Sequence, residues 1–163
     1  MVQISLIAAV SENGVIGKDN GIPWQLREDL EHYKQTVDNS VTISGRVTYE
    51  SIPVIQGRKQ VVMSRRETLE LEENTYHAQS RDEATEVAKE IADGDETVYI
   101  IGGENIYRTF LEIADEMILS HVEGEYEGDT YFPEFEDSNW NPVERDPREG
   151  FEIVTYERSQ KEI

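Results

Sequence analysis

One carboxylic acid in this chain has neighbours that would change its chemistry. Asp29 follows a turn-rich segment, residues 15–27, which contains a Pro-Trp pair ending at Trp24. It precedes Leu30 at the expected start of a helix, with Tyr33 on the next helical turn. Burial among such neighbours raises the pKa of a carboxyl group, and a raised pKa suits a proton donor near neutral pH. Asp29 is therefore our candidate acid.

A cluster of basic residues interrupts an acidic chain. The net charge is −20, yet residues 46–66 contain five basic side chains and a single acidic one, Glu50. The basic residues are Arg46, Arg58, Lys59, Arg65 and Arg66. Such a cluster favours an anionic ligand, because phosphates and carboxylates accept paired hydrogen bonds from arginine. The alternative is that these residues form salt bridges with the acidic remainder of the protein.

Two glycine-containing turns follow expected strands and open expected helices. They are Ser44-Gly45-Arg46-Val47-Thr48 and Ile101-Gly102-Gly103-Glu104-Asn105. Glycine lets the backbone approach a pyrophosphate closely, and the amides of a helix N-terminus favour negative charge. Neither turn matches the G-x-G-x-x-G fingerprint or the P-loop. With the basic cluster nearby, the turns indicate a phosphate-containing ligand held outside the standard Rossmann and Walker frameworks.

Metal and nucleophilic chemistry receive little support. The absence of cysteine excludes disulfides, thiolate metal sites and a cysteine nucleophile. His32, His77 and His121 lack the spacing of metal ligands, and no G-x-S-x-G is present. Residues 123–134 have the spacing of a calcium-binding EF-hand loop, but glutamate occupies early positions that need short side chains. We expect a solvated acidic loop there and no metal site.

Length and charge exclude further classes of protein. The 163 residues fit a single domain, and no 18-residue apolar run exists to span a membrane. A net charge of −20 would repel nucleic acid. The scarcity of lysine, together with the acidic excess, indicates a surface adapted to concentrated salt, although an ordinary acidic cytosolic protein is an alternative. We expect a cytoplasmic monomer that binds small molecules.

Strands and helices alternate along the chain. The pattern predicts a mostly parallel central sheet of about eight strands with an antiparallel C-terminal edge hairpin and about four flanking helices. Ser80 and Glu83 form a capping box at the third helix. Residues 146–150 should form the hairpin turn. Strands are expected at residues 3–10, 41–44, 60–63, 74–78, 98–101, 116–122, 141–145 and 151–158, and helices at 27–35, 46–52, 82–92 and 104–113.

In order along the chain, these pieces resemble dihydrofolate reductase, and the resemblance covers essentially all of residues 1–163. The acidic bias is similar to that of reductases from salt-loving archaea. The matching strings are residues 4–9 (ISLIAA), residues 15–17 (VIG), Pro23-Trp24, Asp29-Leu30, residues 45–52 (GRVTYESI), Gly57-Arg58, Ile101-Gly102-Gly103, Tyr107 and residues 127–133 (EGDTYFP).

The resemblance implies a division of the site between substrate and cofactor. Asp29, supported by Trp24 and the Ser120 hydroxyl, would face the pteridine, and Arg58 would hold the α-carboxylate of the glutamate tail. The substrate pocket would be lined by Ile7, Ala8, Leu30, Tyr33, Ile52, Ile101 and Tyr107. NADPH would contact Ala9, Ile16, Gly17, Gly45, Arg46, Val47, Thr48, Ser64, Arg65, Gly102, Gly103, Glu104, Asn105 and Ile106. The peptide between the two glycines would be cis.

These expectations define a reaction and its rivals. The resemblance implies NADPH-dependent reduction of 7,8-dihydrofolate to tetrahydrofolate, by hydride transfer to C6 and protonation at N5. A pyrimidine reductase of riboflavin synthesis would share the fold and cofactor, but it would lack the pairing of Trp24 with Asp29 and would not need Arg58. A non-catalytic acidic binding protein is the third possibility. Tyr33 also departs from the family pattern, because phenylalanine is frequent at this position.

Overall fold

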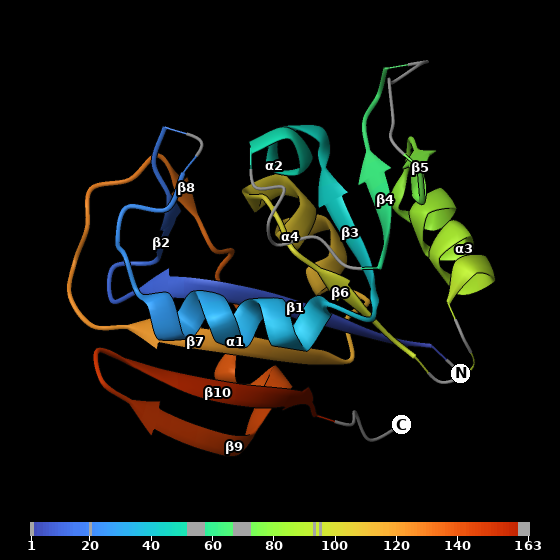
Figure 1. Ribbon diagram of the computed structural model, residues 1–163. Helices are drawn as coiled ribbons and strands as arrows, with labels where there is room; N and C mark the ends of the chain where they lie inside the picture. Colours follow the sequence, from blue (N-terminus) through green and yellow to red (C-terminus); the bar gives the residue numbers. More distant parts are fainter. Residues whose placement is uncertain are drawn as a thin grey trace.

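A twisted eight-stranded sheet forms the centre of the molecule in the order β5-β4-β3-β6-β1-β7-β10-β9 (Figure 1). The computed structural model describes residues 2–19, 21–51, 58–66, 73–92, 94 and 96–159. Its elements are β1 (Gln3–Ser11), β2 (Val15–Gly17), α1 (Arg27–Val37), β3 (Val41–Gly45), α2 (Arg46–Ser51), β4 (Lys59–Met63), β5 (Thr75–Ala78), α3 (Arg81–Ile91), β6 (Thr97–Ile100), α4 (Glu104–Leu111), β7 (Glu116–Val122), β8 (Thr130–Tyr131), a 3-10 helix η2 (Asp137–Asn139), β9 (Trp140–Arg148) and β10 (Phe151–Arg158).

The strands from β5 to β7 run parallel, and of the C-terminal pair β10 runs against them while β9 again points in their direction. β1 pairs in parallel with both β6 and β7, whereas β10 pairs antiparallel with β7 and with β9. The predicted fold class is therefore confirmed: a mostly parallel sheet with an antiparallel edge hairpin and four α-helices among the described residues. None of these described helices is long and apolar enough to cross a membrane.

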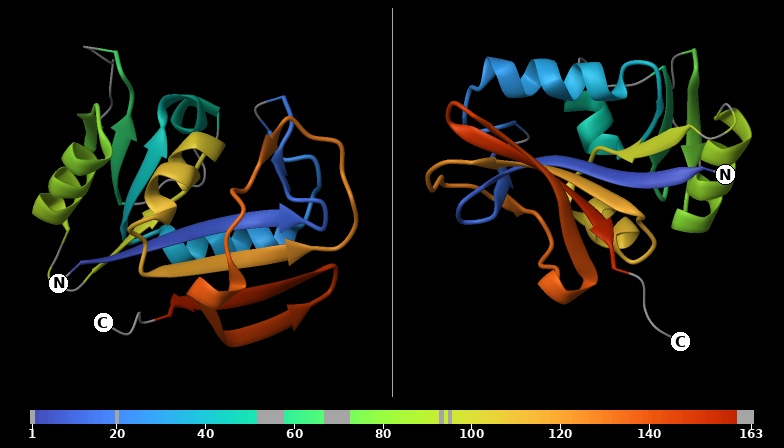
Figure 2. Two further views of the ribbon diagram at one scale, coloured as in Figure 1. Left: turned by 180° about the vertical axis from the view of Figure 1, so that it is seen from behind. Right: turned by 90° about the horizontal axis from the view of Figure 1, so that it is seen from below.

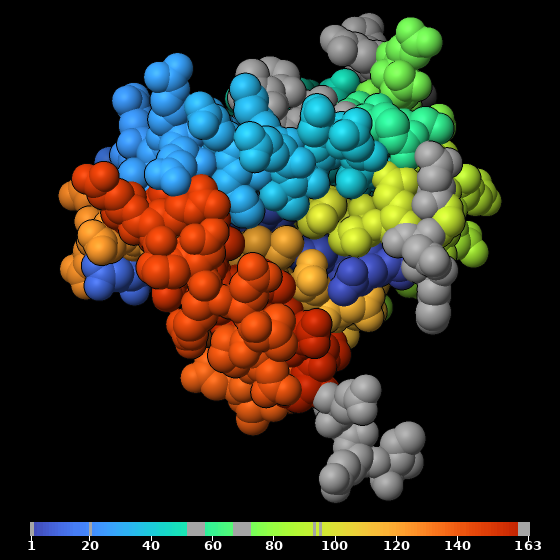
Figure 3. All heavy atoms as spheres, turned by 60° about the horizontal axis from the view of Figure 1, so that its bottom comes forward, coloured from blue at the N-terminus to red at the C-terminus, as the bar shows by residue number. Residues whose placement is uncertain are grey.

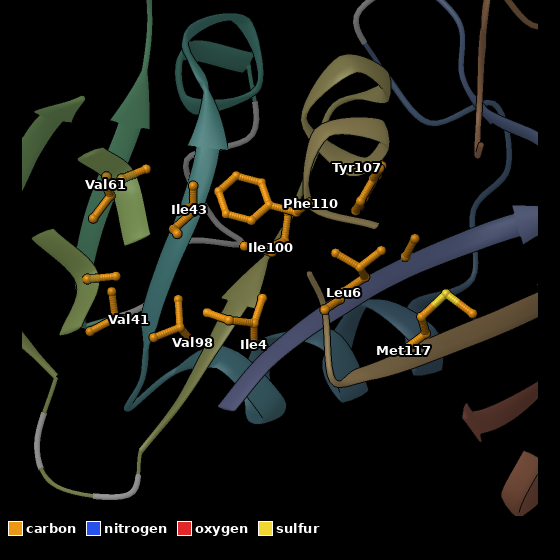
Figure 4. Packing of buried hydrophobic residues seen from close by; sticks show 14 of the residues in the cluster. Ile4, Leu6, Val41, Ile43, Val61, Val98, Ile100, Tyr107, Phe110 and Met117 are labelled. Carbon is orange, nitrogen blue, oxygen red and sulfur yellow. The ribbon is translucent and has the colours of Figure 1, made fainter. Parts of the chain in front are cut away.

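Helices cover both faces of the sheet, and each face has its own apolar core. On one face, Phe110 of α4 packs against Leu6, Ile43 and Ile100 from three neighbouring strands (Figure 4). On the other face, α1 buries Tyr33 and Val37 in a smaller cluster. Figure 2 shows α1 and α4 on opposite sides of β1. Alternate residues of the central strands therefore serve two different cores.

Local sequence signals explain where several helices begin. The Ser80 hydroxyl accepts a hydrogen bond from the backbone N–H of Glu83 at 3.1 Å, as the predicted cap requires. In contrast, α1 begins after Leu26 without a side-chain cap. It carries Glu28 and Asp29 in its first turn, where negative charge is favourable to the helix dipole.

The C-terminal hairpin differs from the prediction in its length. β9 continues to Arg148, so the turn contains only Glu149 and Gly150, and Gly150 has a φ of +84°. The prediction placed Pro142 inside the strand and assigned residues 146–150 to the turn, because Asp, Pro and Gly are typical turn residues. Because β9 is the edge of the sheet, the missing N–H groups of its prolines leave no ladder bond unmade on the outer side.

A small second sheet was not predicted. β2 and β8 pair antiparallel away from the main sheet, and residues 124–130 close over β2. A Cβ at Gly128 would lie 2.3 Å from Cγ1 of Val15 and 2.7 Å from the carbonyl oxygen of Gly17. Glycine at 128 therefore lets the two segments touch. Strands of three and two residues carry too little periodicity to be found from sequence.

Candidate active site

A cavity of about 860 Å³ opens between α1, the end of β1 and the turns that precede α2 and α4. It has an apolar part beside α1 and a more polar part beside the two glycine-containing turns. Most of the residues predicted for the site line it: Ala8, Ala9, Ile16, Gly17, Trp24, Asp29, Leu30, Tyr33, Gly45, Arg46, Val47, Thr48, Ser64, Ile101, Gly103, Glu104, Asn105, Ile106 and Tyr107.

Asp29 lies in the wall of the apolar part and is only 6% exposed. Burial raises the pKa of its carboxyl group above 3.8, and a side-chain hydrogen bond from Ser120 opposes that rise. Ser120 itself is buried on β7 and does not line the cavity, so it contacts Asp29 from behind. The carboxyl group of Asp29 therefore keeps its proton to a higher pH than that of an ordinary aspartate.

Two tyrosines meet at the back of the cavity. The hydroxyl of Tyr33 donates to the carbonyl oxygen of Ile7 at 2.8 Å, and the hydroxyl of Tyr107 donates to the same oxygen at 2.7 Å. Burial raises the pKa of Tyr33, and it raises that of Tyr107 as well. Both side chains therefore remain neutral hydrogen-bond donors, and together they join α1 and α4 to β1. Ile7 contributes its backbone behind the wall and does not itself line the cavity.

Backbone rather than side chain lines the cavity at the end of β6. The peptide between Gly102 and Gly103 is cis, and Gly102 has a φ of +110°. A Cβ at Gly102 would lie 3.1 Å from the ring of Tyr107, and one at Gly103 would lie 3.3 Å from the Thr48 hydroxyl. The N–H of Gly45 donates to the carbonyl oxygen of Gly102 at 2.8 Å. The two glycine-containing turns are thus tied to each other, with room for a ligand beside their backbones.

The basic cluster separates into paired and unpaired arginines. Arg46 forms an ion pair with Glu50 at 3.0 Å, and Arg58 forms one with Glu96 at 2.9 Å. For these two residues, the salt-bridge alternative is realised. Arg65 and Arg66 are exposed and have no ion-pair partner among the described residues. In the chain they directly follow Ser64, which lines the cavity.

Some predicted residues lie apart from the cavity, and others were missed. Arg58, Arg65 and Gly102 are described but do not line it, and Ile52 lies outside the described residues. Lining residues that were not predicted are Gly21, Ile22, Gln25, Leu26, Arg27, Ser51, Met63, Asp129 and Thr130. The string EGDTYFP could have pointed to Asp129 and Thr130. The string GRVTYESI could likewise have pointed to Ser51. We find no comparable signal for Met63, because this strand end reaches the cavity only through the tertiary fold.

The acidic segment after β7 is exposed as expected. Glu123, Glu125 and Glu127 all face solvent, and Lys18 pairs with Glu127 at 3.2 Å. The described residues contain no group of three or more acidic or histidine side chains placed to hold a metal ion. The segment instead supports β2 from the outside.

Comparison with known proteins gives this geometry its context. The sequence model of the family described as dihydrofolate reductase matches residues 3–160. The chain is 41% identical to dihydrofolate reductase HdrB of Haloferax volcanii, with 98% of this chain and 85% of that protein covered. It is 34% identical to the dihydrofolate reductase of Bacillus subtilis, with 95% and 94% covered. The chain belongs to the dihydrofolate reductase family.

The fold agrees with this assignment. The structure of a dihydrofolate reductase from Enterococcus faecalis complexed with NADP(H) superposes with a TM-score of 0.83 at 24% identity and covers 97% of both chains. At that identity, the likeness concerns the fold alone. The prediction of an NADPH-dependent dihydrofolate reductase is confirmed by the family match, and neither rival function receives support.

Proposed function

We propose that the chain reduces 7,8-dihydrofolate to 5,6,7,8-tetrahydrofolate in this cavity, with Asp29 as the acid. The observation that carries the proposal is the position of that carboxyl group. Among the described residues that line the apolar part of the cavity, Asp29 is the single carboxylic acid, and it is 6% exposed. The amino and ring N–H groups of a pteridine can donate hydrogen bonds to a carboxyl oxygen, and an apolar slot suits the faces of the ring.

The cofactor would occupy the polar part of the same cavity. Gly45 and Gly103 line the cavity and carry no side chain, so their backbones would allow a pyrophosphate to approach closely. Arg65 has no ion-pair partner among the described residues and is available to a 2′-phosphate, with Ser64 and Thr48 alongside. When bound, NADPH supplies the hydride that is added to C6. The residues present fit such a ligand.

The protein would contribute orientation, exclusion of water and control of one proton. The backbones of Ala9 and Ile16 lie between the two parts of the cavity and would position the nicotinamide amide. Tyr33, Leu30 and Ile101 would hold the substrate ring against Asp29. The protonated form of Asp29 would favour addition of a proton at N5. Such positioned acids typically contribute about 10²- to 10⁴-fold to a rate.

Arg58 has a defined partner that the proposal must accommodate. Its Nη2 bonds both carboxylate oxygens of Glu96, at 2.9 and 3.0 Å, and its Nε donates to the carbonyl oxygen of Asn39 at 3.3 Å. In our proposal, the glutamate tail of the substrate approaches this already paired guanidinium. The tail therefore gains less from Arg58 than it would from a free one.

A spectrophotometric assay in molar KCl tests the function. We expect the absorbance of NADPH to fall only when dihydrofolate is present. If folded protein causes no such fall, the proposal is contradicted. Asp29→Asn should lower the hydride-transfer rate at neutral pH by at least about a hundredfold and leave NADPH affinity nearly unchanged. Glu31→Gln is the matched control, because Glu31 lies on the same helix but is exposed and outside the cavity. Near-normal turnover of Asp29→Asn would remove Asp29 from its proposed role.

A further inference from the structure

Two buried polar atoms stand out near the proposed acid. Oδ1 of Asp29 and Nε2 of His32 are buried and have no hydrogen-bond partner among the described residues. Both side chains come from α1 and are three residues apart, so they lie on one face of the helix within about 5–6 Å at their Cβ atoms. Unpartnered buried polar atoms are uncommon and costly. No hydrogen bond or ion pair joins the two side chains to each other, so a proton could pass between them only through a bridging water.

The hairpin closes over this part of α1. Figure 3 shows the C-terminal hairpin packed beside α1, and Arg148 of β9 reaches Glu28 at 3.0 Å. Arg148 also holds Asp146 at 2.8 Å, so its guanidinium is committed to two carboxylates. The charged groups that act on His32 are Asp29 from α1 and Arg148 and Asp146 from β9. His32 as a residue is only partly buried although its Nε2 is buried, so another part of the residue reaches solvent.

From this geometry we propose that His32 is the positioning residue through which Asp29 exchanges its proton with solvent. The inference rests on the proposed function. The substrate gains one proton at N5 in each turnover, and a bound ligand covers the cavity side of Asp29. If Asp29 supplies that proton, it is left as a carboxylate. The imidazolium of His32 then returns a proton to Oδ1 through one bridging water, and the neutral imidazole takes up a proton from solvent.

The electrostatics of the pair suit such an exchange. Burial raises the pKa of Asp29 and lowers that of His32, so the two values move toward each other. Proton transfer between groups of similar pKa costs little free energy. The mutual influence is also reciprocal: the carboxylate favours the charged imidazole, and the charged imidazole favours the carboxylate. A histidine is the side chain whose charge changes most readily near neutral pH.

The first test needs no turnover. The chain has three histidines, so their imidazole resonances can be followed by NMR across a pH series and assigned with single variants. We expect His32 to titrate below 6.5 and to titrate lower still in Asp29→Asn, because that variant lacks the carboxylate that favours the imidazolium. An unchanged His32 titration in Asp29→Asn would overturn the inference.

The second test separates proton exchange from simple hydrogen bonding. His32→Gln keeps an amide near the position of Nε2 but does not titrate, so kcat at pH 7 should fall by about tenfold with KM for dihydrofolate nearly unchanged. His32→Ala should lose as much and regain activity when imidazole is added. His121→Gln is the matched control, since His121 is another partly buried histidine but contacts Tyr156 away from the cavity.

Each outcome of the kinetic test has one meaning. Loss in both His32 variants with rescue of His32→Ala by imidazole supports the inference. Full activity of His32→Gln, or a loss without rescue and with a raised KM, overturns it and assigns His32 a structural role. Inactivity of the wild-type protein toward dihydrofolate would instead overturn the proposed function, so the two failures are distinguishable.

Discussion

The backbone N–H of Asp19 donates to Oδ2 of Asp129 at 2.9 Å, across a separation of 110 residues. The N–H of Asp129 in turn donates to the carbonyl oxygen of Gly17 at 3.0 Å. This pair of bonds fixes the segment after β2 against the segment before β8. Both Gly17 and Asp129 line the cavity. One exposed carboxylate therefore helps to shape the part of the site where the nicotinamide is proposed to bind.

Asp129→Ala should loosen that segment without unfolding the protein. We expect NADPH affinity to fall several-fold and kcat to fall with it, because the loop no longer closes the cavity in one position. The free energy of unfolding should change by less than about 1.5 kcal/mol, since an exposed hydrogen bond contributes little. Fluorescence titration and thermal unfolding measure the two effects. Glu125→Ala provides the control on the same loop, because Glu125 is exposed. An equal effect there would show that local charge, not this contact, is responsible.

Asp29→Asn should stabilise the protein while it impairs the reaction. The folded-state pKa of Asp29 is raised above 3.8, so the folded state binds this proton more tightly than the unfolded state. Ionised Asp29 therefore costs stability at pH values above its folded pKa, and this cost disappears as the pH falls through that pKa toward 3.8. The variant should have a higher Tm than wild type at neutral pH and a similar Tm at strongly acid pH. A lower Tm at neutral pH would indicate that the carboxylate is well solvated.

Cofactor choice should depend on Arg65 and Arg46. Replacing both with Ala should weaken NADPH binding far more than NADH binding, because only NADPH carries the 2′-phosphate. Of the two, Arg65 should matter more, since Arg46 must first release Glu50. Arg145→Ala on the distant hairpin is the control for loss of positive charge. Equal losses for NADPH and NADH would assign these arginines to the pyrophosphate or to the fold.

The charge of −20 should make stability depend on salt. Like charges repel in the folded protein, and the Debye length shrinks from about 30 Å at 0.01 M to about 3 Å at 1 M salt. We expect a steep rise of Tm with KCl up to several tenths molar and a slower rise beyond. If the later rise reflects stronger apolar burial, sulfate should exceed chloride. A Tm that stays flat or falls across the KCl series would show that the acidic surface is not a salt adaptation.

Most of the sheet could be predicted because its signals are local. Residues 98–101 at β6 form a continuous apolar run, and the cap at Ser80 is a short-range pattern. Glycine between strand and helix identified the turns before α2 and α4, and the family pattern then identified Asp29. These features depend on residues that are close in the chain or on strings that recur in the family.

Other features depend on residues brought together only by folding. Nothing local indicates that Glu96, 38 residues from Arg58, would occupy its guanidinium. The same holds for Arg148, which joins Glu28 over a separation of 120 residues, and for the buried nitrogen of His32 beside Asp29. The length of β9 was misjudged because residues 146–150 have the residue types of a turn, whereas the strand continues to Arg148. Such pairings require the topology before they can be inferred.

That edge strand would matter in concentrated salt. β9 presents an open row of backbone groups, and such edges invite pairing with another chain. Many proteins discourage this pairing with charge, but at 1 M salt charges are screened beyond about 3 Å. Pro142 and Pro147 act differently, because each removes a backbone donor from the edge whatever the ionic strength. In concentrated salt, these prolines would therefore still oppose edge-to-edge aggregation, although electrostatic repulsion between edges is screened.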